Sequence, residues 1–352
     1  MSRTERILHL GLGAFARAHL AWYTKHAGDD TLIVPLESRV TGPLAEQGGR
    51  YGLISRGSEA DAAEEIDNVD GFVRDLSLLG TSSTLSIVTL TVTEAGYLPG
   101  ARPPALIVDG LRARRDAGRG ALALVPLDNL PSNGRVLRGA VLSLAEPELA
   151  SWIDDNVSFV STMVDRITPA TTPADVAVAK RLLGWEDAIP VVTEPFSEWV
   201  LQGEFPAGRP AWETAGAKFV DDVEPYEQRK LWMLNGAHSL LAYRGLELGH
   251  TTVFEAWGDP VLAAEVEQLW SEAQEVLTLP AAEVDGWLAA LRIRFQNPRI
   301  EHRLAQIAQG GDQKIPARIG GVIRAREAAG LRAGTAELET TAAWDRYRNG
   351  TK

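Results

Sequence analysis

A lysine, an asparagine and a histidine follow one another at short intervals in the stretch 225–250, at Lys230, Asn235 and His238. At about 100° per residue of an α-helix, Asn235 would lie roughly 140° and His238 roughly 80° around the helix from Lys230, with Glu227 near roughly 60°. All four side chains would therefore share one side of a predicted helix. Several leucines fall in the same arc, which makes this side a packed face rather than a solvated one.

Burial on such a face gives the lysine a possible chemical role. A lysine that loses hydration has a lowered pKa, and it can then accept a proton near neutral pH. The same residues also fit a purely structural helix, in which the lysine amine reaches solvent and the histidine is a satisfied core residue. The spacing alone leaves both interpretations open.

A strand, a glycine turn and a helix are expected at the start of the chain. The apolar run 6–10 is followed by Gly11-Leu-Gly13-Ala14-Phe15-Ala, and a helix is predicted over 15–26. In a dinucleotide-binding fold, Gly11 allows the tight turn and Gly13 lets backbone amides approach a pyrophosphate at the helix N-terminus. We therefore predict Gly11, Gly13, Ala14 and Phe15 as cofactor-binding residues, although a chance glycine turn would show the same pattern.

The second predicted strand, 31–36, ends at Glu37-Ser-Arg39. An acidic residue about 20 residues beyond the glycines can bond the ribose hydroxyls of NAD. Glu37 favours NAD over NADP, because its carboxylate would repel a 2′-phosphate. Arg39 leaves NADP open, because a nearby arginine can bind that phosphate. The alternative is a pair of solvated loop charges.

Strands and helices alternate up to about residue 222. Predicted strands cover 51–56, 85–93, 121–127, 190–194 and 218–220, and predicted helices cover 106–117 and 133–145. Asn129 follows one strand directly, at the edge where open α/β sheets bind ligands, and it is either a hydrogen-bond donor there or a turn residue that caps the next helix. Asp165 and Arg166 form a structural pair or line a cleft.

The pattern becomes helical after Pro225, with strings such as 260–277 and 281–294. The expected fold class is therefore α/β. A Rossmann-type dinucleotide-binding domain, 1–222, is followed by a mainly α-helical substrate-binding and catalytic domain, 223–352.

The composition argues against several classes of function. The 352 residues have a formal net charge of −12, and such an acidic chain does not indicate a nucleic-acid or membrane-surface partner. It has no cysteine, which excludes disulfides, thiolate nucleophiles and Cys-ligated zinc. Its six histidines form no close metal-ligand pattern, so no metal is expected. A polar N-terminus and the lack of a long apolar run predict a cytoplasmic protein without a membrane span.

Long stretches of the chain share one further pattern. They are HLGLGAFARAH from His9, LDNLPSNGRVLRGAV from Leu127, NVSFVSTMVDRITPATT from Asn156, TEPFSEWV from Thr193, FPAGRPAWE from Phe205, DVEPYEQRKLWMLNGAHSLLAY from Asp222, RFQNPRIEH from Arg294 and QKIPAR from Gln313. Together they resemble the polyol-specific long-chain dehydrogenases, the family of mannitol 2-dehydrogenase, fructuronate reductase (mannonate oxidoreductase) and tagaturonate reductase. The resemblance covers most of the chain.

This resemblance implies a metal-independent, NAD(P)-linked dehydrogenase that acts on a small sugar alcohol or sugar acid. The catalytic lysine of the family matches Lys230, and its two oxyanion-binding asparagines match Asn129 and Asn235. Its substrate-orienting histidine matches His238. In this interpretation Lys230 takes the substrate hydroxyl proton during oxidation and returns it during reduction.

The resemblance also concerns the substrate. An aspartate of the family's substrate cleft matches Asp165, and a glutamate linked to proton movement matches Glu227. The stretch 207–236 is close to the mannonate-oxidoreductase branch, so we expect interconversion of a keto-sugar acid such as fructuronate and an aldonate such as mannonate. A carboxylate substrate requires a cation, and Arg294, Arg303 and Lys314 are candidates. The alternative is a mannitol 2-dehydrogenase-type enzyme acting on a neutral sugar alcohol.

The chain departs from this family in two places. It is shorter than most fructuronate reductases and mannitol 2-dehydrogenases. It also reads QGGD before QKIP, where the family more often has DGS. Both departures concern the substrate end of the protein rather than its proton chemistry.

Two competing functions fit parts of the sequence. Tyr226-x-x-x-Lys230 has the spacing of the Tyr-x-x-x-Lys motif of short-chain dehydrogenases, in which the tyrosine is the acid. The N-terminal glycine pattern lacks the Thr-Gly-x-x-x-Gly-x-Gly form of that class, however. A non-catalytic sugar or nucleotide sensor could use the same fold, but the presence of Lys230, Asn235 and His238 favours an enzyme.

Overall fold

A computed structural model describes residues 6–350 of the chain. Contacts between residues divide the chain into two compact units. The first unit ends at Val223, and the second begins at Glu224 and also takes in Gly57–Glu59. The first unit contains a parallel sheet and the second is mainly helical, so the expected fold class is confirmed. The domain division 1–222 and 223–352 is kept as a proposal.

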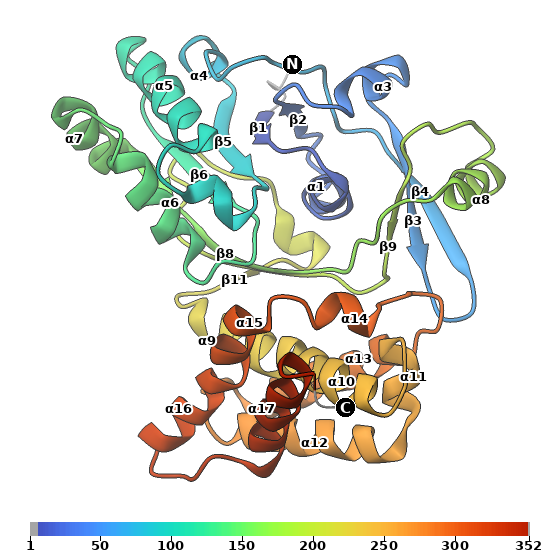
Figure 1. Ribbon diagram of the computed structural model, residues 1–352. Helices are drawn as coiled ribbons and strands as arrows, with labels where there is room; N and C mark the ends of the chain where they lie inside the picture. Colours follow the sequence, from blue (N-terminus) through green and yellow to red (C-terminus); the bar gives the residue numbers. More distant parts are fainter. Residues whose placement is uncertain (1–5, 351–352) are drawn as a thin grey trace. The chain divides into compact units, whose positions relative to one another are not determined.

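The first unit is built on a parallel five-stranded sheet of order β2-β1-β5-β6-β7 (Figure 1). Its strands are β1 (Arg6–Leu10), β2 (Leu32–Pro35), β5 (Leu85–Leu90), β6 (Leu122–Pro126) and β7 (Val157–Phe159). Parallel bridges join Ile33 to Val69 and Leu36 to Val73, so the segment 69–73 lies along the outer edge of β2. The direction of winding reverses at β1, and open α/β sheets bind ligands beyond the carboxyl ends of their strands at such a point.

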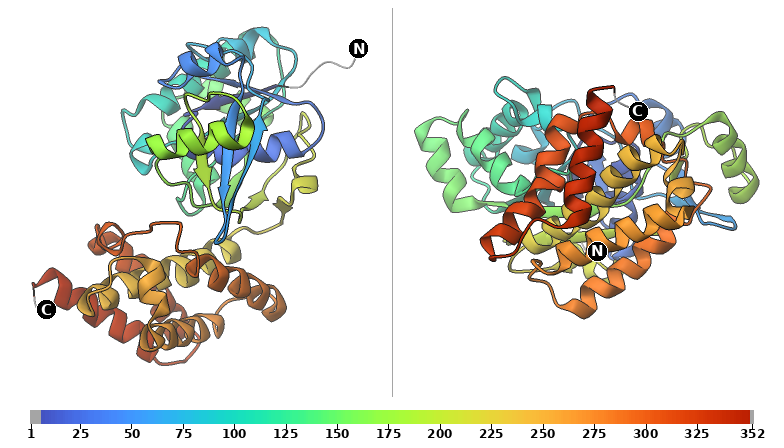
Figure 2. Two further views of the ribbon diagram at one scale, coloured as in Figure 1. Left: turned by 90° about the vertical axis from the view of Figure 1, so that its right-hand side faces the viewer. Right: turned by 60° about the horizontal axis from the view of Figure 1, so that its bottom comes forward.

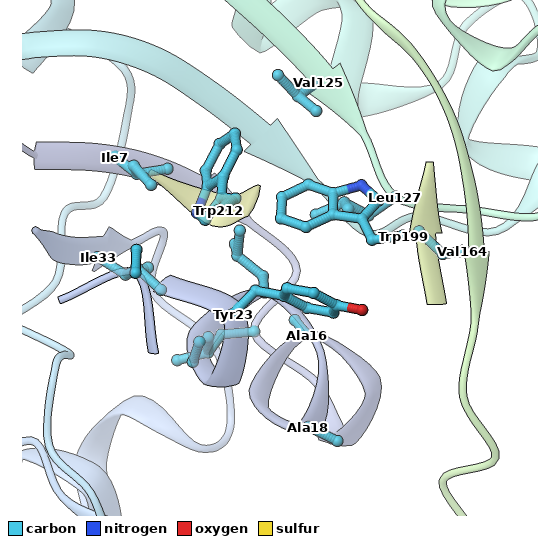
Figure 3. Packing of buried hydrophobic residues seen from close by; sticks show 14 of the residues in the cluster. Ile7, Ala16, Ala18, Tyr23, Ile33, Val125, Leu127, Val164, Trp199 and Trp212 are labelled. Carbon is cyan, nitrogen blue, oxygen red and sulfur yellow. The ribbon is translucent and has the colours of Figure 1, made fainter. Parts of the chain in front are cut away.

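Helices cover both faces of this sheet, which is why its strands are mostly apolar, with His9 and Thr89 buried among the apolar residues. The helices of the first unit are α1 (Ala14–Ala18), α2 (Leu20–His26), α3 (Thr41–Glu46), α4 (Leu78–Thr81), α5 (Arg102–Asp116), α6 (Asn133–Leu142), α7 (Pro147–Asn156) and α8 (Pro173–Leu183), with the 3₁₀ turns η1 (Glu94–Tyr97) and η2 (Trp212–Ala215). On one face Ile7 and Ile33 pack with α1, α2, Trp199 and Trp212 (Figure 3). On the other face Leu8 packs with α5, α6 and α7.

Two three-stranded sheets complete the first unit, in the orders β4-β3-β9 and β11-β10-β8. Their strands are β3 (Tyr51–Arg56), β4 (Asp61–Ile66), β8 (Ser161–Asp165), β9 (Val191–Thr193), β10 (Glu198–Gln202) and β11 (Lys218–Phe219). The strands expected at 51–56, 85–93, 121–127, 190–194 and 218–220 are confirmed, most of them with shorter ends. The sequence did not predict β4, β7, β8 and β10, which carry acidic or hydroxyl side chains within the strand.

The single helix expected over 15–26 is wrong, because the chain breaks it at His19. The backbone of His19 adopts φ −111° and ψ −78°, which ends α1 and begins α2. The side chain is fully buried, stacks on Phe15 and packs edge-on against Trp199, and a ring nitrogen lies 3.2 Å from the carbonyl oxygen of Glu198. Tertiary packing of this ring therefore accompanies the break in helix geometry.

The second unit is an assembly of helices (Figure 2). At its centre lies α10, which is buried on nearly all sides. Its elements are α9 (Glu224–Arg229), the π-helical turn η3 (Lys230–Leu234), α10 (Asn235–Glu247), α11 (Val253–Gly258), α12 (Pro260–Gln274), α13 (Ala281–Phe295), α14 (Leu304–Ile307), α15 (Gly311–Arg318), α16 (Gly320–Ala328) and α17 (Thr335–Arg348). Helices α11, α12, α14, α15 and α17 contact α10. Within residues 6–350, no helix combines the length and apolar character needed to cross a membrane.

Candidate active site

The helix that carries Lys230 is not a continuous α-helix. A π-helical turn, η3, separates α9 from α10 and begins at Lys230. The backbone N–H of Asn235 donates to the carbonyls of both Leu231 and Lys230, and the bond to Lys230 is the i→i+5 bond of a π-helix. The indole N–H of Trp270 donates to the carbonyl of Met233 within the turn at 3.0 Å, which helps to hold the widened geometry.

This turn makes the expected helical angles wrong. In an α-helix, residues five apart lie roughly 140° from each other, whereas an i→i+5 bond places them one turn apart on nearly the same side. Lys230 and Asn235 therefore stand above one another more closely than the sequence predicted, and both are half-buried. Isolated π turns of this kind occur frequently at functional sites.

His238 lies one turn further along α10, and its side chain is 6% exposed. Its ring is 4.6 Å from the ring of His302, edge-on, and 5.3 Å from that of Phe295, measured between centroids. Within the part of the chain that the structure describes, His238 Nε2 and His302 Nδ1 are buried and make no hydrogen bond. Two adjacent imidazoles therefore keep hydrogen-bonding capacity that the protein itself does not use.

Both imidazoles are held in the neutral form. Burial is the main cause that puts the pKa of His238 well below its ordinary value, and the nearby His302 and three cations lower it further. Burial lowers the pKa of His302 to about 4, and the same cations contribute. These cations, which we call the cationic cluster, are Arg294, Lys314 and Arg318.

Two members of the cationic cluster lie four residues apart on α15. Burial lowers the pKa of the Arg318 guanidinium to about 10, and burial together with Arg318 lowers the pKa of Lys314. The Lys314 amine donates to the carbonyl of Ile307 at 3.0 Å. Neither Lys314 nor Arg318 forms an ion pair with an acidic residue among residues 6–350. The cluster therefore holds positive charge at these two positions that no described carboxylate neutralises.

Of the three cations expected from the sequence, Arg294 and Lys314 belong to this cluster and Arg303 does not. The guanidinium of Arg303 pairs with Glu301 at 3.1 Å, and its side chain is 71% exposed. Sequence reasoning missed Arg318, although it ends the QKIPAR string. The i, i+4 spacing of Lys314 and Arg318 on a helix is the signal that would have found it.

On the first unit, the glycine turn after β1 has the geometry that a close backbone approach requires. Gly11 has φ +97°, and a Cβ at this position would overlap the carbonyl oxygen of Thr91. The hydroxyl of Thr91 donates to the carbonyl of Gly11, which joins the turn to the loop after β5. Gly13 is the N-cap of α1, followed by Ala14 and Phe15, and the backbone at Gly11 and Gly13 is exposed.

The other residues predicted for this unit lie as follows. Glu37 is exposed just after β2 and is 3.3 Å from Arg74. Asn129 is exposed just beyond β6, so the turn residues, Glu37 and Asn129 all follow carboxyl ends of strands in the same parallel sheet. Asp165 is buried at the end of β8, opposite Glu198 on β10.

The loop that carries Asn129 is fixed by its neighbour Asp128. This carboxylate accepts hydrogen bonds from the hydroxyl of Tyr97 and from the backbone N–H of Leu130, the latter at 3.0 Å. Burial raises the pKa of Asp128 in spite of these bonds. Asp128 therefore holds the backbone on both sides of Asn129.

Comparison with known proteins decides the family. Residues 5–214 match the mannitol dehydrogenase Rossmann domain, and residues 222–352 match the mannitol dehydrogenase C-terminal domain. The chain belongs to the mannitol dehydrogenase family. It is therefore an oxidoreductase of a family of sugar alcohol and sugar acid dehydrogenases.

Curated and solved members of the mannitol dehydrogenase family match over most of the chain. D-mannonate oxidoreductase of Escherichia coli (strain K12) is 36% identical, and the match covers 90% of this chain and 75% of the relative. Mannitol 2-dehydrogenase of Cereibacter sphaeroides is 34% identical, over 99% of this chain and 82% of the relative. The solved mannitol 2-dehydrogenase of Pseudomonas fluorescens, in a ternary complex with NAD and D-mannitol, superimposes with a TM-score of 0.84 at 32% identity, covering 98% and 79% of the two chains.

Within residues 6–350, no group of three or more histidine, cysteine, aspartate or glutamate residues is placed to hold a metal ion.

Proposed function

We propose that this protein is an NAD-dependent dehydrogenase that interconverts a keto-sugar acid and an aldonate of the fructuronate and mannonate type. The observation that carries the substrate class is the cationic cluster around His238. A carboxylate substrate needs such positive charge, whereas a neutral sugar alcohol does not. The 36% identity to D-mannonate oxidoreductase, over 90% of the chain, supports the same assignment.

The residues of the first unit fit NAD. Gly11 and Gly13 are exposed, as expected of a turn whose backbone amides approach a pyrophosphate. Gly11 has to be a glycine, because a side chain there would overlap Thr91. Ala14 and Phe15 begin the helix that follows this turn. Glu37 is exposed after β2, where a carboxylate binds ribose hydroxyls and disfavours a 2′-phosphate. When bound, NAD supplies the hydride acceptor of the reaction.

The proton chemistry belongs to the second unit. Lys230 accepts the proton of the substrate hydroxyl in oxidation and donates it in reduction. The amide of Asn235, one π turn away, donates a hydrogen bond to the substrate oxygen as negative charge develops on it. His238 is neutral, and its Nε2 binds a substrate hydroxyl. Glu227 lies on α9, three residues before Lys230, and we propose that it takes part in proton exchange.

Two residues of the first unit are proposed from the family resemblance alone. Asn129 would donate to the substrate oxygen, and Asp165 would bind a substrate hydroxyl. Substituting each with alanine should lower turnover without a loss of NAD affinity. A variant with unchanged turnover would remove that residue from the site.

The alternative is a mannitol 2-dehydrogenase-type enzyme that acts on a neutral sugar alcohol. Its support is the 34% identity to the Cereibacter sphaeroides enzyme over 99% of the chain, together with the superposition on the mannitol complex. The two functions share the lysine, the amides and the cofactor, and they differ in what the cationic cluster binds.

The experiment is NADH consumption with fructuronate, followed by the change in nicotinamide absorbance. We expect NADH to be consumed with fructuronate, and at a lower KM for NADH than for NADPH because of Glu37. Fructose with NADH serves as the neutral comparison. Fast consumption with fructose and none with fructuronate would favour the alternative. A lower KM for NADPH would contradict the assignment of Glu37.

A further inference from the structure

The guanidinium of Arg318 is fixed to the protein through one of its three nitrogens. Nη1 donates to the hydroxyl of Ser239 at 3.1 Å and to the carbonyl of Asn235 at 3.3 Å. Ser239 directly follows His238, so these bonds hold the arginine against the part of α10 that carries the proposed site. The side chain is half-buried.

The opposite edge of the same guanidinium has no partner in the described part of the chain. Nε and Nη2 make no hydrogen bond with residues 6–350, and neither belongs to the buried nitrogens that lack a partner, so both are open to solvent. Arg318 also forms no ion pair with these residues. Burial lowers its pKa to about 10, as expected when a charged guanidinium loses part of its hydration.

Other arginines of this chain show what this edge binds. In four of them, Nε and Nη2 grip the two oxygens of one glutamate, in the pairs Arg112–Glu146, Arg244–Glu265, Arg292–Glu267 and Arg346–Glu247. Two parallel bonds of this kind fit the geometry of a carboxylate. Arg318 presents the same edge with no glutamate or aspartate against it.

The surroundings of Arg318 select an anion rather than a neutral group. Lys314 lies one helical turn away on α15 and adds a second positive charge, and both cations lower the pKa of His238 and His302. The two imidazoles are neutral and leave ring nitrogens without a partner, which suits hydroxyl groups. A sugar acid carries both kinds of group on one carbon chain.

We propose that Arg318 binds the carboxylate of the substrate in a two-pronged contact through Nε and Nη2, and so determines the preference for sugar acids over sugar alcohols. This inference rests on the proposed function and assigns its substrate class to one side chain. Arg303, the cation that the sequence suggested nearby, pairs with Glu301 at the surface and does not belong to the cationic cluster, so Arg318 is the preferred candidate.

The test measures binding rather than turnover. Dissociation constants of mannonate, mannitol and NAD are determined by calorimetry, with the sugars titrated into NAD-saturated protein carrying Lys230→Met, so that the reaction does not obscure binding. Arg318→Gln in this background should weaken mannonate about 10- to 100-fold, the loss of a charge-assisted hydrogen bond. The mannonate affinity of Arg318→Lys should lie between those of the parent and of Arg318→Gln, because an ammonium keeps the charge but cannot donate two parallel hydrogen bonds.

The control variant is Arg324→Gln, which makes the same change in net charge on α16. Arg324 is exposed and donates only to the carbonyl of Pro316, so mannonate binding should change less than about twofold. Equal weakening of mannonate and mannitol by Arg318→Gln would show a structural role and overturn the proposal. If Arg318→Gln instead weakens NAD binding, this edge of the guanidinium binds a cofactor phosphate, and the proposal is wrong. Unchanged mannonate binding would also overturn the proposal.

A failure of the proposed function can be distinguished from a failure of the proposal for Arg318. If the unsubstituted enzyme turns over mannitol and not mannonate, the sugar-acid reaction is wrong, whatever the Arg318 variants do. If it turns over mannonate while the variants bind mannonate as tightly as the parent, the reaction stands and the role of Arg318 is wrong.

Discussion

At the scale of single residues, the account depends on Lys230 as the proton acceptor. Lys230→Met should lower the oxidation rate about 10²- to 10⁴-fold, because a positioned general base contributes about this factor. Methionine keeps much of the volume and apolar contact of the lysine stem, so the melting temperature and the affinity for NAD should change little. The measurement is a pH–rate profile of both proteins. If Lys230→Met keeps the wild-type pH–rate profile, Lys230 is not the proton acceptor, and Glu227 or Tyr226 becomes the candidate.

His302 gives a prediction about stability and pH. Its pKa is about 4 in the folded protein and about 6.5 in the unfolded chain, so the unfolded chain binds the proton first as pH falls. The free energy of unfolding should therefore decrease from pH 6.5 towards pH 4. His302→Gln should make the free energy of unfolding fall less steeply as the pH falls. Above pH 7, where His302 is neutral in both states, the difference in stability between the variant and the wild type should not depend on pH.

Denaturant unfolding at a series of pH values measures that slope. Burial also lowers the pKa of His9 to about 4 and puts that of His238 well below its ordinary value, so the wild-type slope contains these two histidines as well as His302. The His302→Gln slope should be smaller than that of the wild type but not zero. Parallel curves for the two proteins would show that His302 is not held neutral by the fold.

Residue types also mark the limit of what the sequence could predict about the site. The sequence points to Lys230, Asn235 and His238 through their spacing and the family resemblance, and their roles are proposals. It did not single out Arg318 and it did include Arg303, because sequence alone does not show that Arg303 pairs with Glu301 or that Arg318 has no acidic partner among residues 6–350. The charge balance of a site depends on tertiary contacts, which the motif does not contain.

At the scale of elements, the glycine turn after β1 can be tested by a single added methyl group. Gly11→Ala forces a side chain into φ +97° and against the carbonyl of Thr91, so it should cost about 1–3 kcal/mol of stability. NAD affinity should fall in the same variant. Gly139→Ala is the matched control, because that position lies in the middle of α6 with open space around it and should gain slightly in helix propensity.

Melting temperatures and NAD titrations of the two glycine variants give the comparison. A Gly11→Ala protein that melts and binds NAD as the wild type does would show that the turn is not the cofactor cradle. Reduced stability in Gly139→Ala would show that the space around a glycine does not by itself predict how an alanine there changes the stability of this unit.

Element boundaries were predictable where one physical signal dominated. The buried parallel strands β1, β5 and β6 are apolar runs, and their positions follow from composition. The strands β4, β8 and β10 contain the acidic residues Asp61, Asp165 and Glu198, respectively. These residues interrupt the apolar pattern from which a strand is predicted. No residue type marks the π turn at Lys230 or the break at His19, because both follow from packing against residues distant in sequence.

At the scale of the whole molecule, a chain of net charge −12 carries a local cluster of positive charge. An acidic protein repels a sugar acid at long range, so the cationic cluster must act at short range and in a partly buried setting. Salt screens this long-range repulsion more completely than the partly buried contact, so added salt should lower the KM for mannonate modestly rather than raise it. The KM for mannitol, a neutral molecule, should not change. Equal salt effects on both would contradict the opposing roles of the net charge and the cationic cluster.

The most direct test of the account compares two substrates with the unsubstituted enzyme. The values of kcat/KM for oxidation of mannonate and of mannitol are measured with NAD under the same conditions. We predict the higher value for mannonate, because only this substrate can use the positive charge at Lys314 and Arg318. A much higher value for mannitol would contradict the central claim and establish the sugar-alcohol alternative.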